Sequence, residues 1–213
     1  MRAFDPTLYF ITDSTPYGEA EFLFRVEQAL RGGATLLQLR EKNRTTREYI
    51  DLAQKTHELS RAYNVPLIID DRVDVALAVQ SDGVHLGQSD MPIKTARKIL
   101  GNDFIIGATT KTVEQATEAY QQGADYCGVG AIYPTTTKVK TVLTSTKTLA
   151  EICAAVPIPV NAIGGLNKTN LSVLEGIPIS GICVVSAIMH AQNPQKEAET
   201  LLNLAKMLTQ SAR

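Results

Sequence analysis

The stretch "LYFITDSTPYGEAEFLFRVEQALRGGATLLQLR", residues 8–40, carries the pattern that decides the fold. It opens with an apolar run (8–12) and closes with another (35–40), and neither run shows a strict polar alternation. Strands buried on both faces of a parallel sheet have this composition. Between the runs, apolar residues recur at helical spacing and a glycine pair ends the segment: Phe22, Val26, Ala29, Leu30, then Gly32 and Gly33. The stretch predicts a strand, a helix and a second, parallel strand.

The same unit recurs along the chain. Further apolar runs occupy residues 66–70, 83–86, 105–109, 126–132, 159–164 and 181–186. Amphipathic helical patterns separate or follow them, the clearest at 45–65, 111–124 and 194–208. Eight strands, each followed by a helix or a helical turn, predict an α/β fold, a (β/α)8 TIM barrel. A doubly wound open sheet is the alternative, but it rarely needs eight evenly spaced units. No linker or charge block divides the chain, so we expect one domain over residues 1–213.

The composition argues against several classes of function. The 213 residues are 44% hydrophobic and 20% charged, with a formal net charge of −1. This balance argues against a broad electrostatic surface for nucleic acid or anionic lipid. No run of about 18 apolar residues suits a membrane span, and the N-terminus lacks a signal-peptide pattern. Three widely spaced cysteines with apolar neighbours predict buried, reduced thiols: Cys127, Cys153 and Cys183. We expect a cytoplasmic protein.

A barrel places its active site at the C-terminal ends of the strands. The second predicted strand ends in "QLREK", residues 38–42. Alternate residues of a strand project to the same side, so Gln38, Arg40 and Lys42 share one side, opposite Leu39 and Glu41. An arginine fork beside a lysine suits phosphate oxygens. The alternative is a surface cluster of ion pairs with Glu41 and Glu48.

Carboxylates follow the next two strands. Asp70 and Asp71 end the third, and Asp90 follows the fourth. Adjacent strands lie about 4.8 Å apart, so side chains at their ends can share one ion. Mg²⁺ prefers one or two carboxylates together with substrate phosphate oxygens and water. Asp71 and Asp90 are therefore the predicted Mg²⁺ ligands. As an alternative, each is a helix N-cap.

The ends of strands five and six carry hydroxyls and cations. Thr109, Thr110 and Lys111 follow strand five, where a threonine also suits a helix cap. Strand six is followed by "PTTTK" (134–138), whose hydroxyls and ammonium suit a phosphate group. A solvated loop is the alternative. The histidines read as structural: His85 as an inward-facing barrel residue, His57 and His190 as surface residues.

The last two strands end in small residues. Gly164 and Gly165 allow close backbone approach to a ligand, and Ser186 opens a short helical segment. The loops after strands seven and eight commonly bind phosphate in this architecture. Two anionic sites follow: one for a diphosphate at strands two to four, and one for a monophosphate at strands seven and eight.

Seven segments, in order, resemble one family: "LYFITD", "LLQLREK", "LIIDDRVDVAL", "DGVHLGQSDMP", "GVGAIYPTTTK", "AIGGL" and "VVSAI". They resemble the thiamine-phosphate synthase family over nearly the whole chain. The resemblance implies a (β/α)8 barrel that joins a hydroxymethylpyrimidine diphosphate to a hydroxyethylthiazole phosphate and releases diphosphate. It implies one Mg²⁺ per subunit, small-molecule substrates, and a homo-oligomer as one possible state.

The resemblance also implies residue roles. The pyrimidine diphosphate would be bound by Gln38, Leu39, Arg40, Glu41, Lys42, Asp70, Thr109 and Lys138. Among these, the groups that act on the leaving diphosphate would be Arg40, Lys42, Thr109 and Lys138. Asp71 and Asp90 would hold Mg²⁺. The thiazole phosphate would be bound by Thr135, Thr136, Thr137, Gly165, Val185 and Ser186. The implied mechanism is dissociative: diphosphate leaves first, and the thiazole nitrogen captures the pyrimidine methylene cation.

The chain departs from the usual family pattern at several positions. Asp70 stands where Asn is common, Thr109 where Ser is common, and Lys111 where many relatives have His. Val139 and Lys140 replace a usual Lys and Asp. Two other functions stay open: a thiazole tautomerase-like isomerase, and a non-catalytic thiamine-phosphate binding protein. The isomerase needs a proton-transfer base, typically the His that Lys111 replaces, and it needs no diphosphate site.

Overall fold

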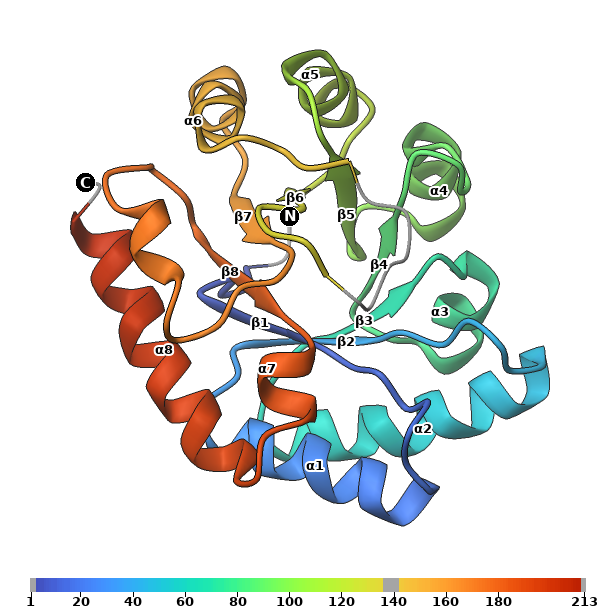
Figure 1. Cartoon of the computed structure of the whole chain (residues 1–213). Helices are drawn as coiled ribbons and strands as arrows, with labels where there is room; N and C mark the ends of the chain where they lie inside the picture. The colour runs from blue at the N-terminus through green and yellow to red at the C-terminus, as the bar shows by residue number, and fades with distance from the viewer. Residues whose placement is uncertain (1–2, 136–141, 212–213) are drawn as a thin grey trace.

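The computed structural model describes residues 3–135 and 142–211, and its strands form a closed parallel barrel (Figure 1). Every neighbouring pair is parallel, and β1 pairs with β8 to close the ring. The predicted (β/α)8 fold is confirmed, and the open-sheet alternative is wrong. The strands are β1 (Leu8–Ile11), β2 (Leu36–Leu39), β3 (Leu67–Asp70), β4 (Gly83–Leu86), β5 (Ile105–Thr110), β6 (Tyr126–Gly130), β7 (Val160–Ile163) and β8 (Gly181–Val184).

Helices surround the strands as an outer ring (Figure 1). A single 3₁₀ turn, η1 (Leu171–Leu174), follows β7, and two helices follow β8. The α-helices are α1 (Glu19–Arg31), α2 (Thr46–Ala62), α3 (Val73–Val79), α4 (Ile93–Leu100), α5 (Val113–Gln121), α6 (Thr146–Ala155), α7 (Ser186–Met189) and α8 (Pro194–Ser211).

Local sequence signals explain where the helices begin and end. α1 buries Phe22, Val26, Ala29 and Leu30 against the barrel, as their spacing predicts. Gly32 follows α1 and lets α8 approach: a Cβ there would lie 2.3 Å from the Gln195 carbonyl oxygen. A capping box starts α2, in which the Thr45 side chain and the Glu48 side chain each accept from the other residue's backbone N–H. Glu48 therefore caps a helix and does not pair with the cations of β2.

Two apolar layers hold the barrel. The larger layer lies between the strands and the helices. The inner layer fills the barrel itself with Tyr9, Ile11, Leu36, Ile68, Ile105, Tyr126 and Cys183. Burial of apolar surface on both faces of the sheet is the main stabilising contribution. Polar side chains also enter the interior, among them Gln38, Asp70 and Asn161. These exceptions place chemistry inside the barrel.

The thiols and histidines only partly follow the predictions. Cys127 and Cys183 are buried, and Cys153 is half-buried. Burial raises the pKa of Cys127 and of Cys153 to about 11. His190 is exposed as expected. The surface expectation is wrong for His57, which is half-buried with its Nε2 3.6 Å from an Asp82 carboxylate oxygen. Across residues 3–135 and 142–211, the helices are too short or too polar to cross a bilayer.

Candidate active site

A cavity of about 620 Å³ opens at the C-terminal ends of the strands. Its lining comes from all eight strands or the loops that follow them. Predicted site residues in this lining are Gln38, Arg40, Lys42, Asp70, Asp71, Asp90, Thr109, Thr135, Gly165, Val185 and Ser186. The structure therefore brings most of the predicted side chains to one cavity.

Two cations and two carboxylates meet at the ends of β2 and β3. The Lys42 Nζ lies 2.7 Å from an Asp70 carboxylate oxygen and also pairs with Asp71. The Arg40 Nε lies 3.8 Å from the same Asp70 oxygen. The cations that follow β2 thus pair with the acids at the end of β3, and the alternative pairing with Glu41 and Glu48 is wrong.

These contacts change the acidity of both aspartates. Burial, followed by repulsion from Asp71, raises the pKa of Asp70 to about 6, although Lys42 and Arg40 oppose the rise. Burial also opposes ionisation of Asp71, but the Lys42 ammonium outweighs it and lowers the pKa of that carboxyl. Partial burial of Lys42 opposes its positive charge, but the carboxylates of Asp70 and Asp71 outweigh this and raise the pKa of Lys42. Asp71 and Lys42 are therefore held as an ion pair at the cavity wall.

Asp71 and Asp90 come from neighbouring strand ends, and both line the cavity. Burial raises the pKa of Asp90; the Gly87 N–H opposes the rise, and the nearby Asp71 carboxyl adds to it. Neither residue caps a helix: the N-caps of α3 and α4 are Arg72 and Pro92, without a side-chain bond. The helix-cap alternative is wrong for both aspartates.

The donor set at this point suits a hard divalent cation. Among the residues that the structure describes, no group of three or more acidic, histidine or cysteine side chains could hold a metal. Mg²⁺ does not need one, because it is usually held by one or two carboxylates while substrate phosphates and water complete its shell. Asp71 and Asp90 supply that pair of carboxylates, and an Asp90 oxygen is fixed by the Gly87 N–H at 2.7 Å.

The end of β5 differs from the sequence prediction. Thr109 and Thr110 belong to the strand and do not follow it. The cap of α5 is Thr112, whose side chain accepts from the Gln115 N–H. Thr109 is half-buried and its Oγ1 lies 2.9 Å from His85 Nε2. His85 is thus a partnered interior histidine, as predicted, but its partner is a predicted substrate-binding residue.

The opposite side of the cavity is built from backbone and small side chains. Gly164 and Gly165 have positive φ angles of 103° and 66°. A Cβ at Gly164 would lie 2.4 Å from Ala131, and one at Gly165 would lie 2.7 Å from the Pro134 carbonyl oxygen. The glycines therefore let the loop after β7 pack against the loop after β6, and both line the cavity. Glycine is required here by the chain's own backbone.

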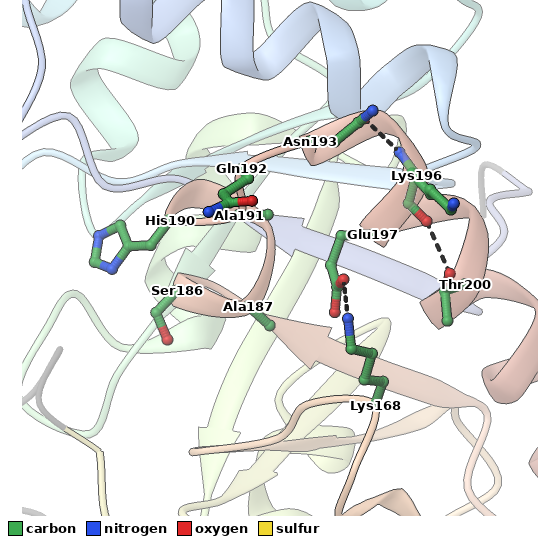
Figure 2. Close-up of a pocket in the computed structure, with 10 residues that line it drawn as sticks. All are labelled: Lys168, Ser186, Ala187, His190, Ala191, Gln192, Asn193, Lys196, Glu197 and Thr200. Carbon is green, nitrogen blue, oxygen red and sulfur yellow. Dashed lines mark hydrogen bonds and ion pairs between the residues drawn. The ribbon is translucent and has the colours of Figure 1, made fainter.

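Ser186 is the first residue of α7, as the sequence predicts. It lines the cavity and also a second hollow of about 440 Å³ between α7, α8 and the loop after β7 (Figure 2). In that hollow, Lys168 Nζ lies 2.7 Å from a Glu197 carboxylate oxygen. Lys168 and Glu197 thus pair with each other in the second hollow. The acids and cations described above lie in the first cavity.

A family model described as thiamine monophosphate synthase matches residues 8–188 of the chain. The chain belongs to the thiamine monophosphate synthase family. It is 47% identical over 202 residues to the thiamine-phosphate synthase of Methanobrevibacter smithii, covering 95% of this chain and 96% of that protein. It is 48% identical over 195 residues to thiamine-phosphate synthase 2 of Streptococcus pneumoniae, covering 92% and 93%.

Two solved structures share the fold of this chain. The thiamine phosphate pyrophosphorylase of Pyrococcus furiosus superposes with a TM-score of 0.87 at 41% identity, covering 95% of this chain and 96% of that chain. A structure of KGPDC from Streptococcus mutans superposes with a TM-score of 0.67 at 14% identity, covering 95% and 98%. The second likeness shows the barrel alone.

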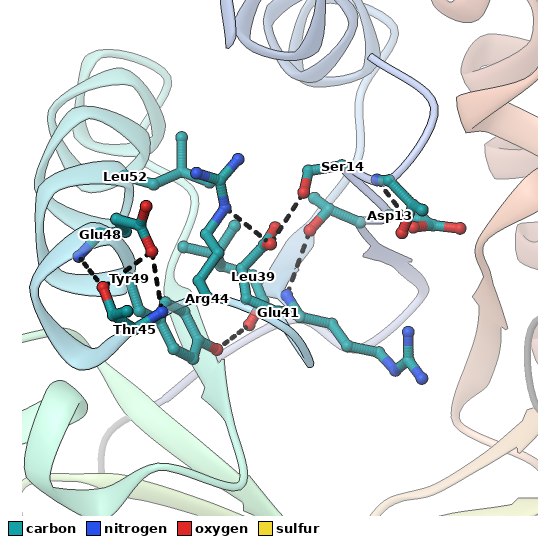
Figure 3. Close-up of polar contacts among 12 residues, drawn as sticks. Asp13, Ser14, Leu39, Glu41, Arg44, Thr45, Glu48, Tyr49 and Leu52 are labelled. Carbon is teal, nitrogen blue, oxygen red and sulfur yellow. Dashed lines mark hydrogen bonds and ion pairs between the residues drawn. The ribbon is translucent and has the colours of Figure 1, made fainter. Parts of the chain in front are cut away.

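Two residues that the family resemblance places at the substrate lie away from the cavity. Leu39 is fully buried in the layer between strands and helices. The Glu41 side chain points away from the cavity, and its carboxylate accepts from Ser14 Oγ at 2.8 Å and from Arg44 Nε at 2.9 Å (Figure 3). The Leu39 carbonyl oxygen accepts from the Tyr49 hydroxyl (Figure 3). Both side chains stabilise the strand end that carries Arg40 and Lys42.

Some predicted residues lie outside the described part of the chain, namely Thr136, Thr137 and Lys138. Thr135, the first threonine of that run, lines the cavity. The structure also adds lining residues that sequence reasoning missed as site residues: Ile11, Gln88, Ser89, Gly130, Ile163 and Cys183. Gln88 and Ser89 stand directly before Asp90 in "GQSD", so their position after a strand was the signal that could have found them.

Proposed function

We propose that the protein is a thiamine-phosphate synthase, a transferase that joins hydroxymethylpyrimidine diphosphate to hydroxyethylthiazole phosphate and releases diphosphate. Family membership over residues 8–188 supports the reaction class. The observation that carries the proposal is the division of one cavity between a side rich in acids and cations and a side of glycine and serine. The first suits a diphosphate with a divalent ion, and the second suits a monophosphate.

On the charged side, Arg40 and Lys42 bind diphosphate oxygens, with Thr109 as a hydroxyl donor. Asp71 and Asp90 would hold one Mg²⁺ per subunit, and the bound ion would supply positive charge beside the leaving diphosphate. Lys138 adds a further cation in this proposal. Asp70 holds Lys42 in place through the 2.7 Å contact of their side chains. No protein nucleophile is needed, because catalysis consists of stabilising the leaving group and positioning the second ring.

On the uncharged side, Gly165, Val185 and Ser186 bind the thiazole phosphate, together with the threonines 135–137. The reaction then runs in two steps. The bond between the pyrimidine methylene carbon and the diphosphate oxygen breaks, and diphosphate keeps the electron pair. The thiazole nitrogen donates its lone pair to the methylene cation, which forms the new carbon–nitrogen bond.

One assay separates this proposal from its alternatives. The purified protein is given both substrates and Mg²⁺, and thiamine phosphate and diphosphate are measured by chromatography and a coupled assay. A synthase forms the two products in equal amounts. An isomerase, given thiazole carboxylate phosphate in a parallel sample, converts it without releasing diphosphate. A binding protein shows tight affinity for thiamine phosphate with no turnover. Either of the last two results contradicts the proposal.

A further inference from the structure

Four hydrogen bonds connect opposite sides of the barrel beneath the cavity. Gln38 Nε2 lies 2.6 Å from the Tyr9 hydroxyl, which lies 2.7 Å from the Tyr126 hydroxyl. The Tyr126 hydroxyl lies 3.0 Å from His85 Nδ1, and His85 Nε2 lies 2.9 Å from Thr109 Oγ1. We call these five residues the interior relay. It begins at one cavity-lining residue, Gln38, and ends at another, Thr109.

The sequence is built to let this relay form. Gly107 on β5 is paired with His85 on β4 and with Tyr126 on β6. A Cβ at Gly107 would lie 2.3 Å from the Tyr126 hydroxyl and 2.5 Å from His85 Nδ1. Only a residue without a side chain lets the two rings meet across that strand. Gly128, paired with Thr109, leaves the same kind of space beside the His85 ring.

The bonding capacity of each group gives the relay a direction. An amide nitrogen only donates, so Gln38 donates to the Tyr9 oxygen. If each hydroxyl donates within the relay, Tyr9 donates to Tyr126 and Tyr126 donates to His85 Nδ1. The His85 ring then donates from Nε2 to Thr109 Oγ1. Run in the reverse sense, the relay would leave the Tyr9 proton without an acceptor among its members.

The buried phenols suit fixed donors. Desolvation by burial raises the pKa of Tyr9 and of Tyr126 well above the ordinary tyrosine value. Both hydroxyls therefore keep their protons across the physiological range. The Phe4 ring also packs edge-on against Tyr126, with ring centroids 5.6 Å apart, which holds the ring in place.

We propose that Tyr126 and His85 are positioning residues that make the Thr109 hydroxyl a one-way donor to an anionic oxygen in the cavity. Thr109 Oγ1 accepts from His85, so its own proton is directed to a second partner. A diphosphate oxygen, which only accepts, is the complementary ligand. The proposal rests on the proposed function for the identity of that ligand, but the proton position on His85 does not depend on it.

The first test needs no substrate. The chain has three histidines, and ¹⁵N-labelled protein compared with the His85→Gln variant identifies the ring signals of His85. We expect Nε2 to carry the proton and Nδ1 to be unprotonated. In Tyr126→Phe the Nδ1 signal should shift, whereas Tyr63→Phe, which removes a hydroxyl bonded to Glu27 outside the barrel, should leave it unchanged. A proton on Nδ1 in the unaltered protein overturns the proposal.

The second test asks whether Tyr126 acts through Thr109. Inorganic diphosphate with Mg²⁺ is titrated into Tyr126→Phe, Thr109→Val and the double variant, with thermal melting as a check that each is folded. Each single change should weaken binding by about tenfold, the effect of one hydrogen bond to a charged group. The double variant should lose no more than Thr109→Val alone, and Thr109→Ser should bind normally.

Losses that multiply in the double variant contradict the proposal, as does unchanged binding by Tyr126→Phe. If Tyr126→Phe does not fold, His85→Gln replaces it in the same cycle. The proposed function fails in a different way, by an absence of thiamine phosphate in the two-substrate assay while the His85 signals and diphosphate binding remain as expected.

Discussion

The two sides of the cavity are made differently. At β2 to β4, long charged side chains meet and already pair with one another, with Lys42 between Asp70 and Asp71. At β7 and β8, the wall is glycine, valine and serine, shaped by backbone at positive φ. Under the proposed function, the first side would recognise charge, and its ion pairs would exchange partners when a ligand enters. The second side, built from backbone, would recognise shape.

The largest effect is expected on the charged side. Asp71→Ala or Asp90→Ala should lower turnover by about 100-fold or more, because stabilisation of the leaving group is lost. Binding of thiazole phosphate alone, measured by calorimetry, should change little. Asp51→Ala, an exposed acidic residue on α2, is the matched control. Equal losses of turnover and of thiazole phosphate binding would contradict the separation of the two sides.

The shape of the uncharged side is tested by Gly165→Ala. A methyl group there would press on the loop after β6, 2.7 Å from the Pro134 oxygen, at a positive φ. The KM for thiazole phosphate should rise by about tenfold, and diphosphate affinity should stay unchanged. Gly101→Ala is the control, since its φ is also positive but nothing lies within 4 Å of the added Cβ. If both variants behave alike, strain and not cavity shape explains the result.

The burial of Asp70 on the charged side predicts a pH effect on stability. An unfolded aspartate has a pKa of about 3.9, and burial raises that of Asp70 to about 6 in the folded chain. The folded chain binds this proton more tightly, so its stabilising effect is full below about pH 4 and is lost as the pH rises through about 6.

Asp70→Asn should remove this contribution. Relative to the unaltered protein, its free energy of unfolding should rise between about pH 4 and about pH 7 by on the order of 2 kcal/mol. Denaturant melts of both proteins without metal measure the difference. A difference that is constant with pH would show that Asp70 is not held at the raised pKa.

The smallest effect is expected in the second hollow. Lys168→Ala breaks a pair with Glu197 in which the lysine side chain is 52% exposed. Exposed ion pairs contribute roughly 0 to 1 kcal/mol, so the melting temperature should barely move and turnover should be normal. A large loss of turnover would show that this hollow, which shares Ser186 with the cavity, also serves the reaction.

The sequence predicts the barrel well because each strand is short, apolar and followed by a helical pattern. It also predicts that Arg40 and Lys42 lie at one cavity, although β2 ends at Leu39 and both cations follow the strand. It does not predict which charges pair, because Lys42 meets Asp70 and Asp71 only through the register of neighbouring strands.

Sequence patterns do not predict the interior relay either. Tyr9 and Tyr126 stand in apolar runs and are 117 positions apart, and only barrel closure brings their hydroxyls together. Gly107 looks like an ordinary strand glycine until the register shows His85 and Tyr126 on either side. Single-residue signals such as "GVHL" therefore indicate an inward histidine but not its partners.

The most direct test is a crystal grown with Mg²⁺ and inorganic diphosphate. We expect octahedral density at about 2.1 Å from oxygens of both Asp71 and Asp90, with diphosphate oxygens completing the shell beside Arg40 and Lys42. Diphosphate bound without an ion, or an ion bound away from Asp71 and Asp90, would contradict it.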